Sequence, residues 1–282
     1  MTHRVTKPRR GAGWPRVTFA TIVVAVYAIP IYLAVVNVFK TEGQIAAEPA
    51  ALPSPWTFGN VLGVITQPDA DLPATLLRTV FLTAATIVGV SIVGSSLGYY
   101  LARHESRVSR ALLAILVMGL AIPFQVILIP VTQVLREIGI FGTYAGLLLF
   151  NIGYYVPFAA LLFSRFARSI PRELDEAAMI DGAGPIRIFY RVVLPLMHPA
   201  GASLAIFLAV WVWNDFVNPL ILLGPRTGTT IMTGLYRTIG QYQVEFGPIF
   251  AFMFIATLPL LILFLLLQDR FINGLTSGAT KG

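Results

Sequence analysis

The chain has 282 residues, of which 56% are hydrophobic and 12% charged, with a formal net charge of +7. A soluble domain contains about 25% charged residues, so a chain this apolar cannot cover a water-facing surface. The composition excludes a soluble enzyme and a disordered chain. It also excludes a nucleic-acid-binding module, because the basic residues lie scattered between apolar runs. A lipid bilayer is the expected surrounding.

Six stretches are long enough to cross a hydrocarbon core, which requires about 20 apolar residues in a helix. In chain order they lie near 17–38, 79–102, 111–134, 144–164, 200–223 and 248–268. They predict an all-α membrane protein with one transmembrane domain, 17–268, between tails 1–16 and 269–282. Prolines inside these stretches predict kinks. In the second stretch, Gly94 and Gly98 predict a small-residue face for close helix contact.

The distribution of Lys and Arg predicts the orientation in the membrane. Fifteen of the twenty lie in the two tails and in the loops after the second and fourth stretches. Because basic residues concentrate on the cytoplasmic side, we expect both termini to be cytoplasmic. The predicted location is the cytoplasmic membrane of a bacterium or archaeon, crossed several times.

Two loops are expected on the outside. Residues 39–78 read as an outer loop with little structure of its own. The second loop, 224–247, contains glycines that allow it to flex, and uncharged hydrogen-bonding groups suited to contacting a partner: Thr229, Thr230, Tyr236 and Tyr242. The alternative is a plain solvated connection.

The inside loop, 165–199, carries the clearest local signals. Pro171 and three acids favour a helix start, and Gly182 lies where a left-handed residue ends a helix. Pro185 can start a second short helix with Phe189 and Val193 on one face. The pattern predicts a helix, a glycine turn and a second helix. The alternative is an amphipathic hairpin that only braces the bundle.

Several short motifs resemble a known family. Glu176-Ala177-Ala178, Asp181-Gly182-Ala183 and Leu194-Pro195-Leu196 resemble the EAA signature of ABC importer membrane subunits. Trp213-Asn214-Asp215-Phe216 with Pro219-Leu220 resembles the WNEF…PL pattern of the carbohydrate-uptake branch, with Asp where Glu is commoner. The resemblance covers about residues 17–282 and is closest to the shorter, MalG-like permease subunit.

The resemblance implies a type I ABC importer permease fold, in which six transmembrane helices carry a cytoplasmic coupling-helix loop. It implies four kinds of partner: a second homologous permease, two ABC ATPase subunits, an extracytoplasmic sugar-binding protein and a sugar substrate. The residues that it assigns to ATPase coupling are Glu173, Glu176, Ala177, Ala178, Asp181 and Gly182.

Catalysis is expected to belong to the partners. The sequence has no glycine-rich loop of the kind that cradles nucleotide phosphates, so ATP and Mg²⁺ are expected on the ATPase subunits. With no cysteine and three separated histidines, we expect neither a metal site nor a cofactor in this chain, and no enzymatic activity.

Polar residues within the apolar stretches indicate a substrate pathway. Asp215 lies in an apolar stretch, where a charge costs roughly 2.5–3.5 kcal/mol. A polar and aromatic lining is predicted from Gln125, Asn151, Tyr155, Trp213, Asn214, Asp215 and Asn218. One alternative is that these groups bond to neighbouring helices and hold the bundle together. Another is an ion-coupled secondary carrier that uses Asp215, which would leave the inside loop unexplained.

Overall fold

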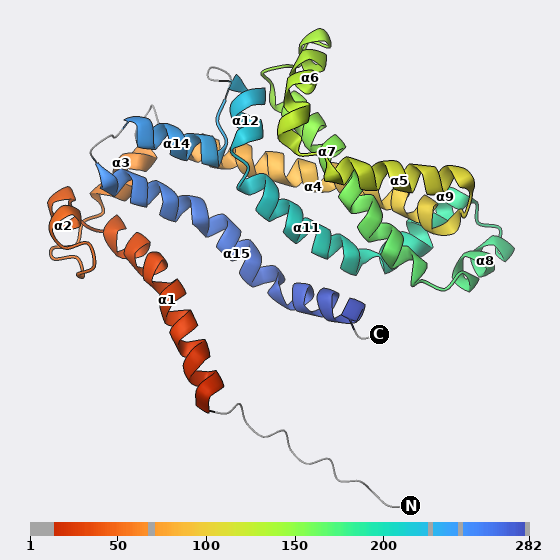
Figure 1. The fold of residues 1–282 in the computed structure, drawn as a ribbon, viewed down its shortest axis with the longest axis horizontal. Coiled ribbons are helices and arrows are strands. Elements are labelled where there is room, and N and C mark those ends of the chain that lie inside the picture. Colours follow the sequence, from red (N-terminus) through yellow and green to blue (C-terminus); the bar gives the residue numbers. More distant parts are fainter. Residues whose placement is uncertain (1–13, 67–70, 225–227, 242–244, 280–282) are drawn as a thin grey trace, which may run out of the picture. The chain divides into compact units, whose positions relative to one another are not determined.

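A computed structural model describes residues 14–66, 71–224, 228–241 and 245–279. Every regular element in these ranges is helical (Figure 1). The all-α prediction is confirmed.

Four helices are long and apolar enough to cross a membrane unbroken. They are α1 (Trp14–Val38), α4 (Leu72–Arg103), α7 (Tyr144–Arg168) and the first part of α15 (Phe246–Ala279). Two bent pairs raise the number of spans to as many as six, if each pair is one span.

The first bent pair corrects the prediction of one helix over 111–134. Helices α5 (Arg107–Ala121) and α6 (Phe124–Glu137) meet at 104°. Pro123 has no N–H for a helix ladder and disfavours the helical conformation in the residue before it. Ile122 is accordingly extended, with φ −82° and ψ 119°.

The second bent pair, residues 185–213, contains the first part of the predicted stretch 200–223. Residues Pro185–Leu196 and α11 (His198–Trp213) meet at 71°. The chain then leaves the helix at Asn214 and resumes as α12 (Val217–Leu222). The fifth predicted stretch is therefore interrupted.

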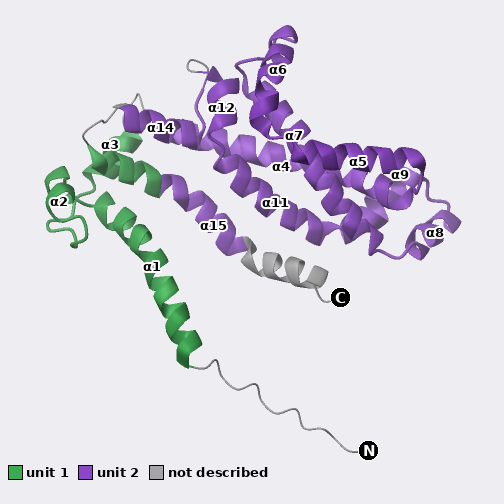
Figure 2. Cartoon of the chain, in the orientation of Figure 1, with its two compact units in different colours: residues 1–67, 242–254 green, residues 68–241, 255–282 purple. Residues whose placement is uncertain are grey.

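The chain forms two compact units (Figure 2). Unit 1 comprises residues 1–67 and 242–254, and its described part contains α1, α2 (Glu42–Ala47) and α3 (Gly59–Thr66). The expectation that 39–78 has little structure was wrong, because buried polar contacts order it. Lys40 donates to the carbonyls of Glu48 and Pro49 at 2.8 and 3.1 Å. Asn60 caps the carbonyls of Val38 and Lys40 at 3.0 and 2.7 Å.

Unit 2, residues 68–241 and 255–282, is built on α4 and α7, which share the most extensive helix contact of the described chain. Glycines allow their backbones to approach. A Cβ on Gly98 would lie 2.8 Å from the Ala160 carbonyl oxygen, and one on Gly94 would lie 2.5 Å from Cβ of Ala159. The predicted small-residue face is confirmed.

Candidate functional site

The inside loop folds as a helix, a glycine turn and a second helix. Helix α8 (Glu173–Ile180) is followed by Gly182 at φ +79°, where a side chain would be strained. The turn closes with hydrogen bonds from Gly182 N–H to Met179 O at 3.0 Å and from Ala183 N–H to Ala178 O at 2.9 Å. The predicted glycine cap is confirmed.

The second helix begins as α9 (Pro185–Ile188) and continues through a π-helical turn, η1 (Phe189–Val193), into α10 (Leu194–Leu196). Phe189 and Val193, which were predicted to lie on one face of this helix, are both buried. The Phe189 ring lies 5.3 Å from the ring of Tyr99 on α4. The second helix therefore packs the loop against the body of unit 2.

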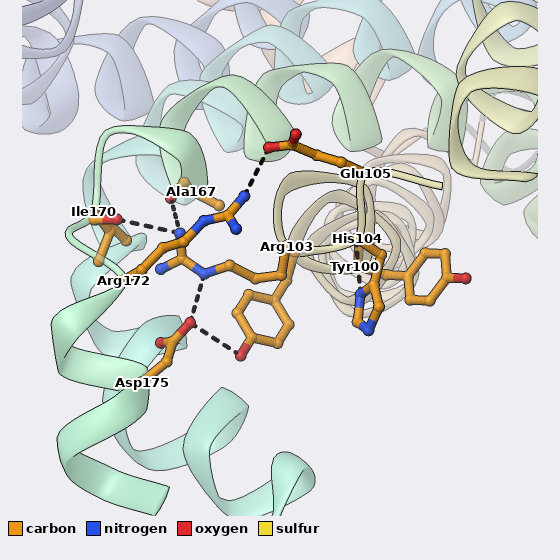
Figure 3. A network of polar contacts seen from close by, with 9 residues as sticks. Tyr100, Arg103, His104, Glu105, Ala167, Ile170, Arg172 and Asp175 are labelled. Carbon is orange, nitrogen blue, oxygen red and sulfur yellow. Dashed lines mark hydrogen bonds and ion pairs between the residues drawn. The ribbon is translucent and has the colours of Figure 1, made fainter. Parts of the chain in front are cut away.

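A buried ion pair that sequence reasoning missed fastens the first helix. Arg103 Nε at the end of α4 lies 2.5 Å from Asp175 Oδ2 in α8, and only 9% and 8% of the two side chains are exposed. Nη1 of Arg103 also donates to the carbonyls of Ala167 and Ile170 at 3.1 and 3.2 Å (Figure 3). One guanidinium thus joins the ends of α4 and α7 to the start of α8.

The remaining face of this coupling unit, residues 173–193, is open. Five of the six predicted coupling residues are exposed, and the sixth, Ala178, is half-buried. Large apolar side chains stand among the acids: Ile180 is 87% exposed, Ile186 75% and Met179 58%. A surface that combines carboxylates with protruding apolar groups is typical of a protein contact.

Four of the seven predicted pathway residues meet in one pocket of about 520 Å³ between α6, α7, α11 and α12. They are Tyr155, Asn214, Asp215 and Asn218. Aromatic rings form much of the remaining wall, and Tyr155 and Trp211 stack at 5.7 Å with an interplanar angle of 19°.

The other three predicted residues do not line this pocket. Gln125 is exposed on α6. Asn151 is buried and donates to Thr86 on α4 at 3.4 Å, and Trp213 donates to the Ala256 carbonyl on α15 at 3.1 Å. The alternative of bonding to neighbouring helices therefore holds for Asn151 and Trp213.

Asp215 and Asn214 form their described side-chain hydrogen bonds with near neighbours in the chain, on either side of the break between α11 and α12. The Asp215 carboxylate accepts from the backbone N–H of Asn218 at 3.2 Å and from its Nδ2 at 2.8 Å. Asn214 donates to Val210 O at 2.8 Å. The Asp215 carboxylate thereby satisfies the N–H of Asn218, which lies in the first turn of α12 and has no ladder partner, as the interior of a membrane requires.

The second predicted outer loop is largely a helix, α14 (Ile231–Gln241). Thr230 is 1% exposed, so its assignment as an accessible partner contact was wrong. Thr229 is half-buried, and its hydroxyl lies 2.8 Å from that of Thr75. Tyr236 is 58% exposed beside Phe216, and Tyr242 lies outside the described residues.

Acidic and histidine side chains do not gather anywhere in the described ranges in a group that would hold a metal ion. The candidate sites are the open face of residues 173–193 and the polar break between α11 and α12.

Several helices that are long and apolar enough to span a membrane, packed around a polar break, are the features of an integral membrane protein. The chain belongs to the family of binding-protein-dependent transport system inner membrane components, whose family model matches residues 94–277.

Named relatives agree with this family. The melibiose/raffinose/stachyose import permease protein MelC of Bacillus subtilis is 32% identical over 264 residues, covering 93% of this chain and 95% of MelC. The diacetylchitobiose uptake system permease protein NgcG of Streptomyces coelicolor is 29% identical over 255 residues, covering 90% of this chain and 84% of NgcG.

Solved structures support the fold. A bacterial ABC transporter that imports the acidic polysaccharide alginate matches with a TM-score of 0.78 at 19% identity, over 94% of this chain and all of that one. The alginate transporter in complex with its pentasaccharide-bound periplasmic protein matches at 0.67 and 16% identity, over 90% of this chain and 92% of that one. The comparisons give no support to an ion-coupled secondary carrier.

Proposed function

We propose that the chain is the permease subunit of an ATP-driven, binding-protein-dependent sugar importer, in which it forms half of the translocation pore. The observation that carries the proposal is the coupling unit. It is fixed to α4 and α7 through Arg103 and Asp175, while Glu173, Glu176 and Asp181 stay exposed on its other face.

This arrangement suits the transmission of movement. A partner that displaces α8 also pulls on Arg103, and through it on the ends of two membrane-spanning helices. The exposed carboxylates offer charge-assisted hydrogen bonds to Arg or Lys on an ATPase subunit. ATP and Mg²⁺ are assigned to two such partner subunits, and the coupling unit and both termini to the cytoplasm, following the distribution of basic residues.

The sugar substrate and the remaining partners are inferred from what the related proteins are named for. MelC and NgcG are named for oligosaccharide uptake, and the alginate transporter forms a complex with a periplasmic binding protein. We assign this chain a second homologous permease, an extracytoplasmic binding protein and a sugar substrate. Among the described residues of the second outer loop, the exposed Tyr236 is the candidate for contacting the binding protein.

The pocket at the helix break is proposed to line the sugar pathway. Aromatic faces pack against the apolar face of a sugar ring, while carboxylate and amide groups bind its hydroxyls. Trp211, Asp215 and Asn218 offer both kinds of group in one wall.

The test is sugar-dependent ATP hydrolysis by the importer purified with all its subunits, in nanodiscs, over a panel that includes α-galactosides and chitobiose. Binding protein loaded with the correct sugar should stimulate hydrolysis in the unaltered complex. Glu176→Lys and Gly182→Val should each abolish the stimulation, because one reverses a docking charge and the other strains the turn. Glu137→Lys, an equal charge reversal on the exposed end of α6, is the matched control.

Stimulation that survives both coupling variants would contradict the assignment of the coupling unit. Uptake driven by a proton or sodium gradient without ATP would contradict the importer itself.

A further inference from the structure

A basic hollow of about 960 Å³ lies beside the coupling unit and shares Glu173 with it and Arg103 with the ion pair that fastens it, but the proposed transport function gives no role to its other arginines. Its walls come from the turn between α4 and α5, the first turns of α5, and the segment that joins α7 to α8. Four arginines line it, Arg103, Arg110, Arg168 and Arg172, against two glutamates.

The arginines are not equally neutralised. Arg103 pairs with Asp175, and Arg172 pairs with Glu105 at 2.8 Å (Figure 3). Within the described part of the chain, Arg110 and Arg168 have neither an ion pair nor a side-chain hydrogen bond. The hollow therefore has an excess of positive charge that the chain does not balance.

One buried donor in the wall is also unsatisfied. The Arg103 side chain is only 9% exposed, and its Nη2 has no hydrogen-bond partner among the described residues. A buried N–H group without an acceptor costs about 1–3 kcal/mol, so such groups normally have a partner. Because this Nη2 is covered by the protein, the positive charge that is open to the hollow is that of the exposed Arg110 and Arg168.

The position of the hollow relative to the membrane indicates what kind of anion fits. Arg103 and Arg168 stand in the last turns of two membrane-spanning helices, where phospholipid headgroups lie. The wall also contains the apolar side chains of Leu101, Leu113 and Ile170. A free anion needs only the arginines, whereas a phospholipid uses both the arginines and the apolar wall.

We propose that this hollow binds the phosphate group of an anionic phospholipid, held by Arg110 and Arg168 and bordered by Arg103. The bound phosphate would lie next to the guanidinium that fastens α8. The composition of the membrane would thereby act on the support of the coupling unit.

The test is native mass spectrometry of the full chain in its assembled complex, titrated with phosphatidylglycerol or phosphatidylcholine. The unaltered chain should prefer phosphatidylglycerol, and Arg110→Gln with Arg168→Gln should weaken that binding about 30-fold, from the usual contribution of two basic residues at a membrane surface. Arg107→Gln with Arg165→Gln is the matched control, because it removes the same charge from exposed positions of the same two helices outside the hollow. The control should stay within about twofold of the unaltered chain.

Equal weakening in both double variants would overturn the proposal, since it would show a diffuse surface charge. Displacement of the lipid by millimolar inorganic phosphate would overturn it in favour of a free-anion site. If the isolated chain binds the lipid but the assembled complex does not, a partner subunit occupies the hollow. That result would also overturn the proposal. Both double variants change exposed side chains, so their thermal unfolding should match that of the unaltered chain.

Discussion

Helix α4 is attached differently at its two ends. At the Arg103 end, one buried ion pair and two charge-assisted bonds to carbonyls join it to α7 and α8. At the Leu72 end, neutral hydroxyls join it to the segment that leads into α14: Thr75 meets Thr229, and Thr79 accepts the N–H of Ile231 at 3.0 Å.

The difference shows two ways of satisfying polar groups in an apolar chain. The hydroxyl contacts are distributed, so each threonine serves one or two neighbours and carries no charge. The ionic contacts converge on a single guanidinium, so the loss of one residue removes all of them and leaves a buried carboxylate unpaired. We expect the Arg103 end to be the more sensitive one, which suits a connection to a moving partner.

The largest effect should follow removal of the guanidinium. Arg103→Met should lower the free energy of unfolding by about 3–5 kcal/mol, because it leaves the buried Asp175 carboxylate uncompensated. Unfolding in detergent and substrate uptake at equal membrane levels are the measurements, with the exposed Arg165→Met as control. The double variant Arg103→Met with Asp175→Leu should recover much of the stability but not uptake. Recovery of both would show that the pair is only structural.

The second largest loss of stability is expected from a substitution in the middle of α4. Gly98→Ala should cost about 1–3 kcal/mol, because the new Cβ would meet the backbone of α7 at Ala160 O and Ser164 N, each at 2.8 Å. Gly89→Ala is the control, because its Cβ would meet only the movable end of the Ile152 side chain. Thermal unfolding of both variants tests this, and equal shifts would contradict the close backbone approach.

At the hydroxyl end, Thr79→Val should cost about 1–2 kcal/mol by leaving the buried Ile231 N–H without its acceptor. Thr83 lies one turn further along α4, and its buried hydroxyl has no partner among the described residues. Thr83→Val should therefore be neutral or slightly stabilising. The rate of limited proteolysis around α14 measures the stability of this end. Equal increases in that rate in the Thr79 and Thr83 variants would contradict the role given to the hydrogen bond between Thr79 and Ile231.

The smallest effect should come from the exposed pair of Arg172 and Glu105, whose side chains are 54% and 79% exposed. Glu105→Gln should change stability by less than about 1 kcal/mol, because water screens both charges. The effect should vanish at high salt. A larger change that persists in high salt would mean that this pair belongs with the buried one.

Local signals made part of this molecule predictable. Pro171, the acids of α8 and Gly182 lie within one short segment, so neighbouring residues fix the helix and its positive-φ cap. The pairing of Arg103 with Asp175 joins residues 72 positions apart, and no spacing rule connects them.

The partners of hydroxyl side chains could not be predicted either, because they also lie far along the chain or in the backbone. Thr230 was expected to face a partner because threonine is polar, but its backbone N–H bonds to Thr233 and its side chain is buried. Composition shows that a group can form hydrogen bonds without showing whether water or protein supplies the partner. Among the prolines that predicted kinks, Pro123 marks the 104° break between α5 and α6. The other prolines did not mark interruptions in the same way, because Pro30, Pro130, Pro157 and Pro259 lie inside continuous helices.

The apolar side chains of Ile180, Ile186 and Met179 on the open face of the coupling unit also bear on the cellular abundance of the subunit. In the proposed orientation, a copy without its ATPase exposes this apolar surface to the cytosol, where chaperones and proteases recognise such surfaces. Partner binding covers that surface. The amount of this subunit that accumulates in the membrane is therefore expected to follow the supply of its ATPase and not its own rate of synthesis.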